Sequence, residues 1–178
     1  TRDLWFSAAD GLALHAVDTL PAQQYSSVPL ICLAALTRNS ADFTAFAEYF
    51  AAEAAVPRRV LALDSRGRGK SAHDRNPANY SLAVELGDVE RLLSVTGIER
   101  AMFVGSSRGG LLSMMLLAAR PHAVAGLVLN DVGPVIEPTG LEHVRDDLAV
   151  LASAPPDWET ATAQIAAAHG AAVLDCHI

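Results

Sequence analysis

The sequence predicts an α/β fold: a doubly wound, mainly parallel sheet with an antiparallel hairpin at its N-terminal end. Two observations lead to this prediction. Between residues 28 and 133, apolar runs of strand length alternate with amphipathic helical segments, the order typical of parallel strands joined by helical crossovers. Before residue 28, the apolar stretches LWFS and GLALHAVDTL meet at Asp10-Gly11, a strong hairpin signal.

The strands that follow the hairpin are continuous apolar runs, which is typical of strands covered on both faces. They are expected within VPLICLAAL (28–36), RRVLALD (58–64), ERAMFVG (99–105) and AVAGLVLNDVG (123–133). Cys32 lies inside the first of these runs and is expected to be a small core residue.

Helical periodicity fills the intervals between these strands. Residues 41–55 are expected to form a helix capped by Asn39 or Ser40, with an apolar face of Phe43, Phe46, Ala47, Phe50 and Ala54. The segment 81–97 repeats Leu82, Leu86, Val89 and Leu93 in helical register and has Gly97 as its stop. A third helix is expected from Gly109 to Arg120-Pro121.

The pattern changes after Gly133. Two helices are expected at 137–154 and 157–170, separated by Pro155-Pro156 and with no strand between them. The ending AAVLDCHI (171–178) fits either a short strand or a frayed tail.

Composition limits the classes of function. The 178 residues are 51% hydrophobic and 19% charged, which is enough for one domain with a sizeable core. With 13 Lys and Arg against 20 Asp and Glu, the formal net charge is −7, and SRGRGK is the single basic cluster, so a nucleic-acid partner is not expected. The most apolar run, 111–119, is too short to cross a bilayer. With no signal peptide visible and no initiator Met, we expect a cytoplasmic protein trimmed at its start.

The stretch GSSRG (105–109) contains the frame G-x-S-x-G, and of the adjacent serines only Ser107 fits it. In this frame the serine occupies a sharp turn between a buried strand and a helix, with its hydroxyl exposed at the top of the sheet. Gly105 and Gly109 are expected because a side chain at either position would collide with the neighbouring helix or strand. Ser107 is therefore a candidate nucleophile, and the alternative is a tight turn with surface serines.

Acyl transfer also needs hydrogen-bond donors aimed at the developing oxyanion. Ligands of open α/β sheets bind beyond the carboxyl ends of the strands. At those ends, the main-chain N–H of Arg108, which begins a helix, and that of Leu36, in the loop after ICLAA, are the expected donors.

The stretch DSRGRGKS (64–71) ends like the G-K-[ST] of a phosphate-binding P-loop. Asp64 stands where that motif needs its first glycine, so nucleotide binding is disfavoured. A structural turn is expected instead, tied by charge-assisted hydrogen bonds of Asp64 and Arg66.

Taken in order, LTRN, DSRGRGKS, GIERAMFVGSSRGG and VLNDVGPVIEP resemble the α/β-hydrolase family, most of all the branch of enol-lactonases and meta-cleavage-product hydrolases. The resemblance covers residues 1 to about 145. It implies a Ser–acid–His triad with Ser107 as nucleophile, oxyanion donors at Leu36 and Arg108, and no cofactor or metal. It also implies that residues 1–134 are the N-terminal part of the hydrolase core and 135–178 a partial helical cap with a tail.

Two departures from the family pattern matter. Ala34-Ala35 stands where the family usually has His-Gly or Pro-Gly before the oxyanion residue. The family's cap also leads into two further strands, which carry the usual acid and the histidine, whereas this chain is expected to stop before them.

Other residues are therefore weighed as acid and base. Asp131, at the end of the fourth strand after the hairpin, is the candidate acid, with a turn-capping aspartate as the alternative, and Asp175 is a weaker candidate. His177 is a weak candidate base, and His143 and His169 are weaker still. The remaining histidines are expected to be solvated: His15, His73 and His122.

Together these features predict a serine hydrolase acting on an ester, a lactone or a C–C bond of a small carbonyl substrate. The alternative is a catalytically silent fragment or a small-ligand-binding module on the same core. Because one side of the sheet would be left unpaired, a homo-oligomer or a complementing C-terminal segment is expected as partner.

Overall fold

The computed structural model describes residues 1–23, 27–150 and 156–169. The chain divides into two compact units, Thr1–Pro134 and Val135–Ile178. The second unit contains helices α4 (Pro138–Val150) and α5 (Trp158–His169), which correspond to the two helices expected there. The predicted strand or tail at 171–178 lies outside the described residues.

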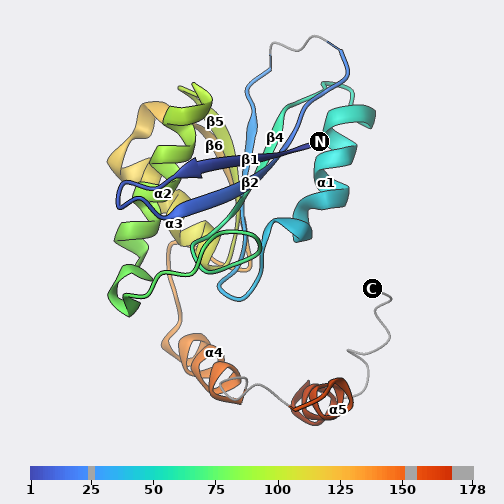
Figure 1. Cartoon of the computed structure of the whole chain (residues 1–178), viewed down its shortest axis with the longest axis vertical. Helices are drawn as coiled ribbons and strands as arrows, with labels where there is room; N and C mark the ends of the chain where they lie inside the picture. Colours follow the sequence, from blue (N-terminus) through green and yellow to red (C-terminus); the bar gives the residue numbers. More distant parts are fainter. Residues whose placement is uncertain (24–26, 151–155, 170–178) are drawn as a thin grey trace. The chain divides into compact units, whose positions relative to one another are not determined.

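The first unit is built on a six-stranded sheet (Figure 1). Its strands are β1 (Arg2–Ser7), β2 (Ala13–Thr19), β3 (Leu30–Leu33), β4 (Val60–Asp64), β5 (Ala101–Ser106) and β6 (Val124–Asn130). They lie in the order β1-β2-β4-β3-β5-β6. The hairpin strands β1 and β2 are antiparallel, β2 joins β4 antiparallel, and all other pairs are parallel. The predicted α/β fold class is confirmed. β6 lies at an edge of the sheet in the described part of the chain, and a partner there stays a prediction.

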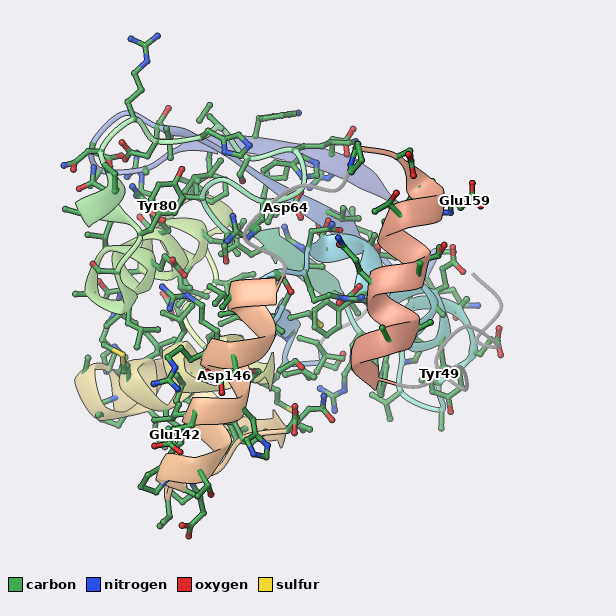
Figure 2. All side chains as sticks on the ribbon, turned by 90° about the horizontal axis from the view of Figure 1, so that it is seen from below. Tyr49, Asp64, Tyr80, Glu142, Asp146 and Glu159 are labelled. Atoms are coloured by element: carbon green, nitrogen blue, oxygen red, sulfur yellow. The ribbon has the colours of Figure 1, made fainter. Side chains whose placement is uncertain are left out.

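The helix expected at 41–55 is divided in the structure. A 3₁₀ turn η1 (Ser40–Phe43) leads into α1 (Thr44–Glu48), which widens into a π-helical turn η2 (Tyr49–Glu53). Asn39 caps the start, accepting a hydrogen bond from the N–H of Ala41. The wider final turn leaves Ala47 and Ala51 as the buried positions, while Tyr49 lies exposed (Figure 2).

The other two crossover helices follow the prediction closely. Helix α2 (Leu82–Thr96) is capped by the Ser81 hydroxyl and ends at Gly97, whose φ of 64° is a left-handed conformation that glycine adopts readily. Helix α3 (Arg108–Ala119) begins directly after Ser107 and ends before Pro121. Short 3₁₀ turns η3 (Pro77–Asn79) and η4 (Pro121–Ala123) precede α2 and β6.

Alternate residues of the central strands belong to two hydrophobic clusters, one on each face of the sheet. Ile31 and Leu33 of β3 join the cluster that α2 and α3 cover, whereas Leu30 and Cys32 join the cluster that α1 covers (Figure 1). Burial raises the pKa of the Cys32 thiol to about 12, so this residue is an unreactive part of the core, as expected.

Replacing Leu116 by alanine is expected to lower the free energy of unfolding by about 2–5 kcal/mol, because its side chain is 0% exposed and its removal leaves a cavity. The neighbouring Leu117, 40% exposed on the same helix, is the matched control, and Leu117→Ala should change stability by about 0.5 kcal/mol at most. Urea unfolding measures both, and equal midpoints for the two variants would contradict this packing.

The turn after β4 is structural, as predicted. The Asp64 carboxylate accepts from the N–H of Ser40 at 2.7 Å and from the N–H of Lys70 at 2.9 Å. Burial alone would raise the pKa of Asp64, but the hydrogen bonds from Lys70 and Ser40 outweigh it and hold the pKa below its usual range. A side chain at Gly69 would overlap this carboxylate, so the turn requires glycine there.

Arg66 is 2% exposed and joins three segments. Its Nε and Nη2 donate to the two carboxylate oxygens of Asp88 in α2, each at 2.8 Å. Its Nη1 donates to Asp10 in the hairpin turn at 2.9 Å and to Asp74 at 3.0 Å. The prediction that Asp64 and Arg66 tie this turn is confirmed.

His15 is not solvated, and that expectation is wrong. The side chain is 1% exposed, with Nδ1 2.7 Å from a carboxylate oxygen of Asp64 and Nε2 2.8 Å from one of Asp3. The reason is the strand order: β2 lies between β1 and β4, so His15 is paired with Trp5 on one side and Asp64 on the other. Periodicity along the hairpin cannot reveal a neighbour that arrives about fifty residues later in the chain.

Candidate active site

Ser107 forms a sharp turn between β5 and α3. Its φ of 46° and ψ of −110° are unusual for a residue with a side chain, and such strain is typical of functional sites. Its N–H donates to the carbonyl of Asn130 at 2.9 Å, and its carbonyl accepts from the N–H of Gly110 at 2.9 Å. The main chain on both sides therefore holds the turn in place.

The two adjacent serines have different surroundings. The Ser106 hydroxyl, at the end of β5, accepts a hydrogen bond from the Asn130 side-chain amide at 3.1 Å. The Ser107 hydroxyl makes no hydrogen bond within the described residues, and its side chain is partly exposed. Ser107 is thus the serine with a hydroxyl available to a ligand.

The glycines around Ser107 are there for steric reasons, as predicted. A Cβ at Gly105 would lie 2.5 Å from the carbonyl oxygen of Gly109, and a Cβ at Gly109 would overlap the carbonyl oxygen of Leu33 in β3. A Cβ at Gly110 would overlap the side chain of Val132. The close approach of α3 to the sheet aims the helix N-terminus at the strand ends.

Leu36 and Arg108, the two expected oxyanion donors, line the same small cavity of about 40 Å³, which has room for a water molecule or a small group. Leu36 lies in the turn after β3, and Arg108 is the first residue of α3. Neither main-chain N–H donates to a protein acceptor within the described residues. Both N–H groups are thus without a protein acceptor in that part of the chain, and the one of Arg108 lies at the positive end of the helix dipole; their role as oxyanion donors stays a prediction.

The side chain of Arg108 is used structurally. Its Nε and Nη2 donate to the two carboxylate oxygens of Glu85 in α2, at 3.0 and 2.7 Å. Nη2 also donates to the carbonyl of Tyr80, a residue that lines the cavity. This bidentate pair neutralises the arginine and ties the start of α3 to α2.

Asp131, the candidate acid, lies directly beyond β6. Ser106 is paired in register with Asn130, so Ser107 and Asp131 directly follow the carboxyl ends of the neighbouring strands β5 and β6. Asp131 has a φ of 56° and an exposed side chain, and it makes no hydrogen bond within the described residues. Its place is compatible with an acid that orients a base, and its backbone conformation equally fits a turn residue.

The structure brings no histidine of the first unit to Ser107. His73 and His122 are exposed, in a loop and in η4, as expected. His143 is exposed on α4, and His169 is the last residue of α5. His177 and Asp175 lie outside the described residues.

Sequence reasoning missed three cavity-lining residues, Arg68, Tyr80 and Glu85. One signal was present: Glu85 and Asp88 share the inward face of the predicted helix with Val89 and Leu92, and both are buried. A carboxylate on an apolar helix face needs a cationic partner, so this pattern could have pointed to Arg108 and Arg66.

Two other kinds of site are absent from residues 1–23, 27–150 and 156–169. No group of three or more His, Cys, Asp or Glu side chains there could hold a metal ion. No helix among the same residues has the length and apolar character needed to span a membrane.

Comparison with known proteins identifies the family. The model of the alpha/beta hydrolase fold matches residues 28–174. A 3-hydroxybutyrate-oligomer hydrolase of Cupriavidus necator is 31% identical over 115 residues, 65% of this chain and 38% of that protein. A putative carbamate hydrolase, RutD of Yersinia enterocolitica, is 36% identical over 92 residues, 51% of this chain and 33% of that protein.

Solved structures agree. An alpha/beta hydrolase from Novosphingobium aromaticivorans superposes with a TM-score of 0.75 at 42% identity, covering 82% of this chain and 49% of that one. A marine microorganism esterase, at 21% identity and a TM-score of 0.74, covers 90% of this chain and 60% of that one and supports the fold alone. The chain therefore spans 33–38% of the length of the two named curated relatives and 49–60% of that of the two solved structures, and it belongs to the alpha/beta hydrolase fold family.

Proposed function

We propose that this chain carries the nucleophile and oxyanion donors of a serine hydrolase that acts on an ester, a lactone or a C–C bond of a small carbonyl substrate. The observation that carries the proposal is the strained turn at Ser107, at the start of α3, whose hydroxyl has no hydrogen-bond partner among the described residues. Its ψ of −110° places Ser107 outside the left-handed region that ordinary turn residues with positive φ adopt, and such strain is typical of functional sites.

In the proposed reaction, the Ser107 oxygen attacks the substrate carbonyl carbon and the carbonyl oxygen becomes an oxyanion. The main-chain N–H groups of Leu36 and Arg108 donate to this oxyanion, and losing one such donor typically costs about 10²–10³ in rate. The tetrahedral intermediate then collapses: the bond to the alkoxide or carbanion leaving group breaks, and this group takes up the proton that Ser107 has lost, which leaves an acyl group on the serine oxygen. Water attacks the acyl carbonyl carbon, the bond to the serine oxygen breaks, the carboxylic acid is released and Ser107 regains a proton.

Proton transfer needs a base within about 3 Å of the serine oxygen. We propose Asp131 as the acid that orients it, on the evidence of its place next to the end of β5. In this chain the candidate base is His177. Without a base, the site would retain only the part of catalysis that comes from binding and the oxyanion donors, about 10³–10⁴-fold over water.

The relatives support the substrate class. Their names include a 3-hydroxybutyrate-oligomer hydrolase and, at 35% identity over 94 residues, the sn-1-specific diacylglycerol lipase ABHD11 of Mus musculus. Both names denote hydrolases, and the second acts on a carboxylic ester. We extend carboxylic-ester chemistry to this chain on that basis, with lactones as cyclic members of the same class.

A fluorophosphonate probe tests the proposal directly. We expect it to form a covalent adduct on Ser107, because phosphorus is attacked by the same activated oxygen and its phosphoryl oxygen occupies the oxyanion position. Peptide mass spectrometry after digestion locates the adduct, and heat-denatured chain is the control. An adduct on Ser106, or equal labelling of native and denatured chain, would contradict the proposal.

A catalytically silent binding module is the second candidate. Ala34-Ala35 favours it, because Ala34 is buried and the two methyl groups stand directly before the oxyanion turn. Purified chain and its Ser107→Ala variant would then hydrolyse a short activated ester at the same rate.

A further inference from the structure

We propose that Arg68 selects substrates that carry a carboxylate group in addition to the bond that is cleaved. The inference rests on the proposed function, because it assigns the cavity lined by Leu36 and Arg108 to the substrate. It concerns recognition and not the chemical step.

Arg68 is held firmly at the wall of this cavity. Its Nε donates to the carbonyl of Leu36 at 2.7 Å, and its Nη1 donates to the carbonyl of Gly67 at 3.0 Å. A guanidinium has five N–H donors, so most of them remain available after these two bonds. The first bond also places the charge directly beside the turn that contains the oxyanion donor.

Three arginines line the cavity, and they differ in charge balance. Arg66 is paired with Asp88, Asp10 and Asp74, and Arg108 is paired with Glu85. Arg68 has no carboxylate within ion-pair distance in the described part of the chain, since both of its bonds go to neutral carbonyls. Its charge is therefore the one positive charge in the cavity lining that the described residues leave uncompensated.

A half-buried cation without a counter-ion favours an anionic ligand. Partial burial weakens screening by water, and the planar guanidinium fork matches the two oxygens of a carboxylate. The chain as a whole carries a formal charge of −7, so its overall field would repel an anion. Preference for an anionic substrate would therefore have to come from a local positive charge such as that of Arg68. A carboxylate on the substrate would complete the pairing that Asp88 and Glu85 provide for the other two arginines.

Matched esters test the inference. The substrates are the 4-nitrophenyl monoester of suberic acid, with a free terminal carboxylate, and the same ester with a terminal amide. We expect the chain to prefer the carboxylate by about tenfold or more in kcat/KM, the range of one charge-assisted hydrogen bond. Arg68→Gln should remove the preference and Arg68→Lys should restore part of it. Arg75→Gln, which removes an exposed arginine and changes the net charge equally, should leave it intact.

Two results would overturn the inference. Equal kcat/KM for both esters in the unchanged chain would show that the cavity ignores the carboxylate. If Arg68→Gln lowered kcat/KM by the same factor for both esters, Arg68 would only position the turn that contains Leu36.

A binding measurement separates this inference from the proposed function. In the Ser107→Ala variant, titration with suberic acid monoamide should shift the NMR signal of the Arg68 Nε–H group, and the neutral diamide should not. Binding in this variant together with no hydrolysis by the unchanged chain would refute the proposed function and leave the carboxylate site standing. Hydrolysis by the unchanged chain, together with no shift of the NMR signal by the carboxylate ligand, would refute the carboxylate site and leave the proposed function standing.

Discussion

Ser107→Ala is expected to lower hydrolysis of an activated ester at least to the residual rate that binding and the oxyanion donors provide, whereas Ser106→Ala is expected to keep most of the activity. Both residues are serines and they are adjacent in the chain, so a difference in activity between the two variants reports the position of the hydroxyl and not its chemistry. Ser106 Oγ accepts from Asn130, while the Ser107 hydroxyl has no partner in the described residues and sits in the strained turn. Losing one neutral hydrogen bond at Ser106 should cost less than about tenfold in rate.

Initial rates with purified variants, corrected for spontaneous hydrolysis, measure this effect. Thermal unfolding serves as the control, since both variants should keep the fold. An active Ser107→Ala together with an inactive Ser106→Ala would show that the G-x-S-x-G frame was assigned to the wrong serine.

Gly109→Ala is expected to cost about 3 kcal/mol of stability or more, at the upper end of the range for overpacking. The new methyl group would overlap the main-chain carbonyl of Leu33, and a β-strand cannot move away as a flexible side chain can. Either α3 would shift from the sheet or β3 would distort, and both changes would disturb the turn at Ser107.

Gly87 offers a matched control within a helix. A Cβ there would meet no atom within 4 Å, so Gly87→Ala should stabilise the chain by about 0.5–1 kcal/mol, through the lower entropy of the unfolded chain. Urea unfolding followed by circular dichroism measures both variants. If Gly109→Ala were as stable as Gly87→Ala, the close contact between α3 and β3 would be refuted.

Local pattern was sufficient to predict most of the fold. The hairpin at Asp10-Gly11, the stop of α2 at Gly97 and the strand–turn–helix around Ser107 all depend on neighbouring residues, and each occurs where expected. The widening of α1 into a π-helical turn at Tyr49–Glu53 was not predicted. Helical periodicity carries no signal for that.

The candidate site was predictable only in its main-chain parts. Ser107, Leu36 and Arg108 follow from the motif and the strand ends, and their roles stay predictions. The side chains around them could not be paired from sequence alone, because Glu85 and Arg108 meet only once α2 and α3 pack together. His15 was misjudged for the same reason, since its partner Asp64 comes from a strand far along the chain.

The strand order has a consequence for the folding pathway. The hairpin β1–β2 is synthesised before β3, β4 and β5. Strand β2 nevertheless pairs with β4 and not with β3, and β3 in turn needs β5 on its other side. The hairpin can therefore form early but cannot join the sheet until β4 has been synthesised. Strand β3 is paired on both sides only after β5 has followed. Pairing across such long stretches of chain slows folding, so the nascent chain would expose strand edges for longer than a sheet of sequential neighbours. In the native state, the amide protons of β3 should be among the slowest to exchange with solvent, because their release requires both flanking strands to separate.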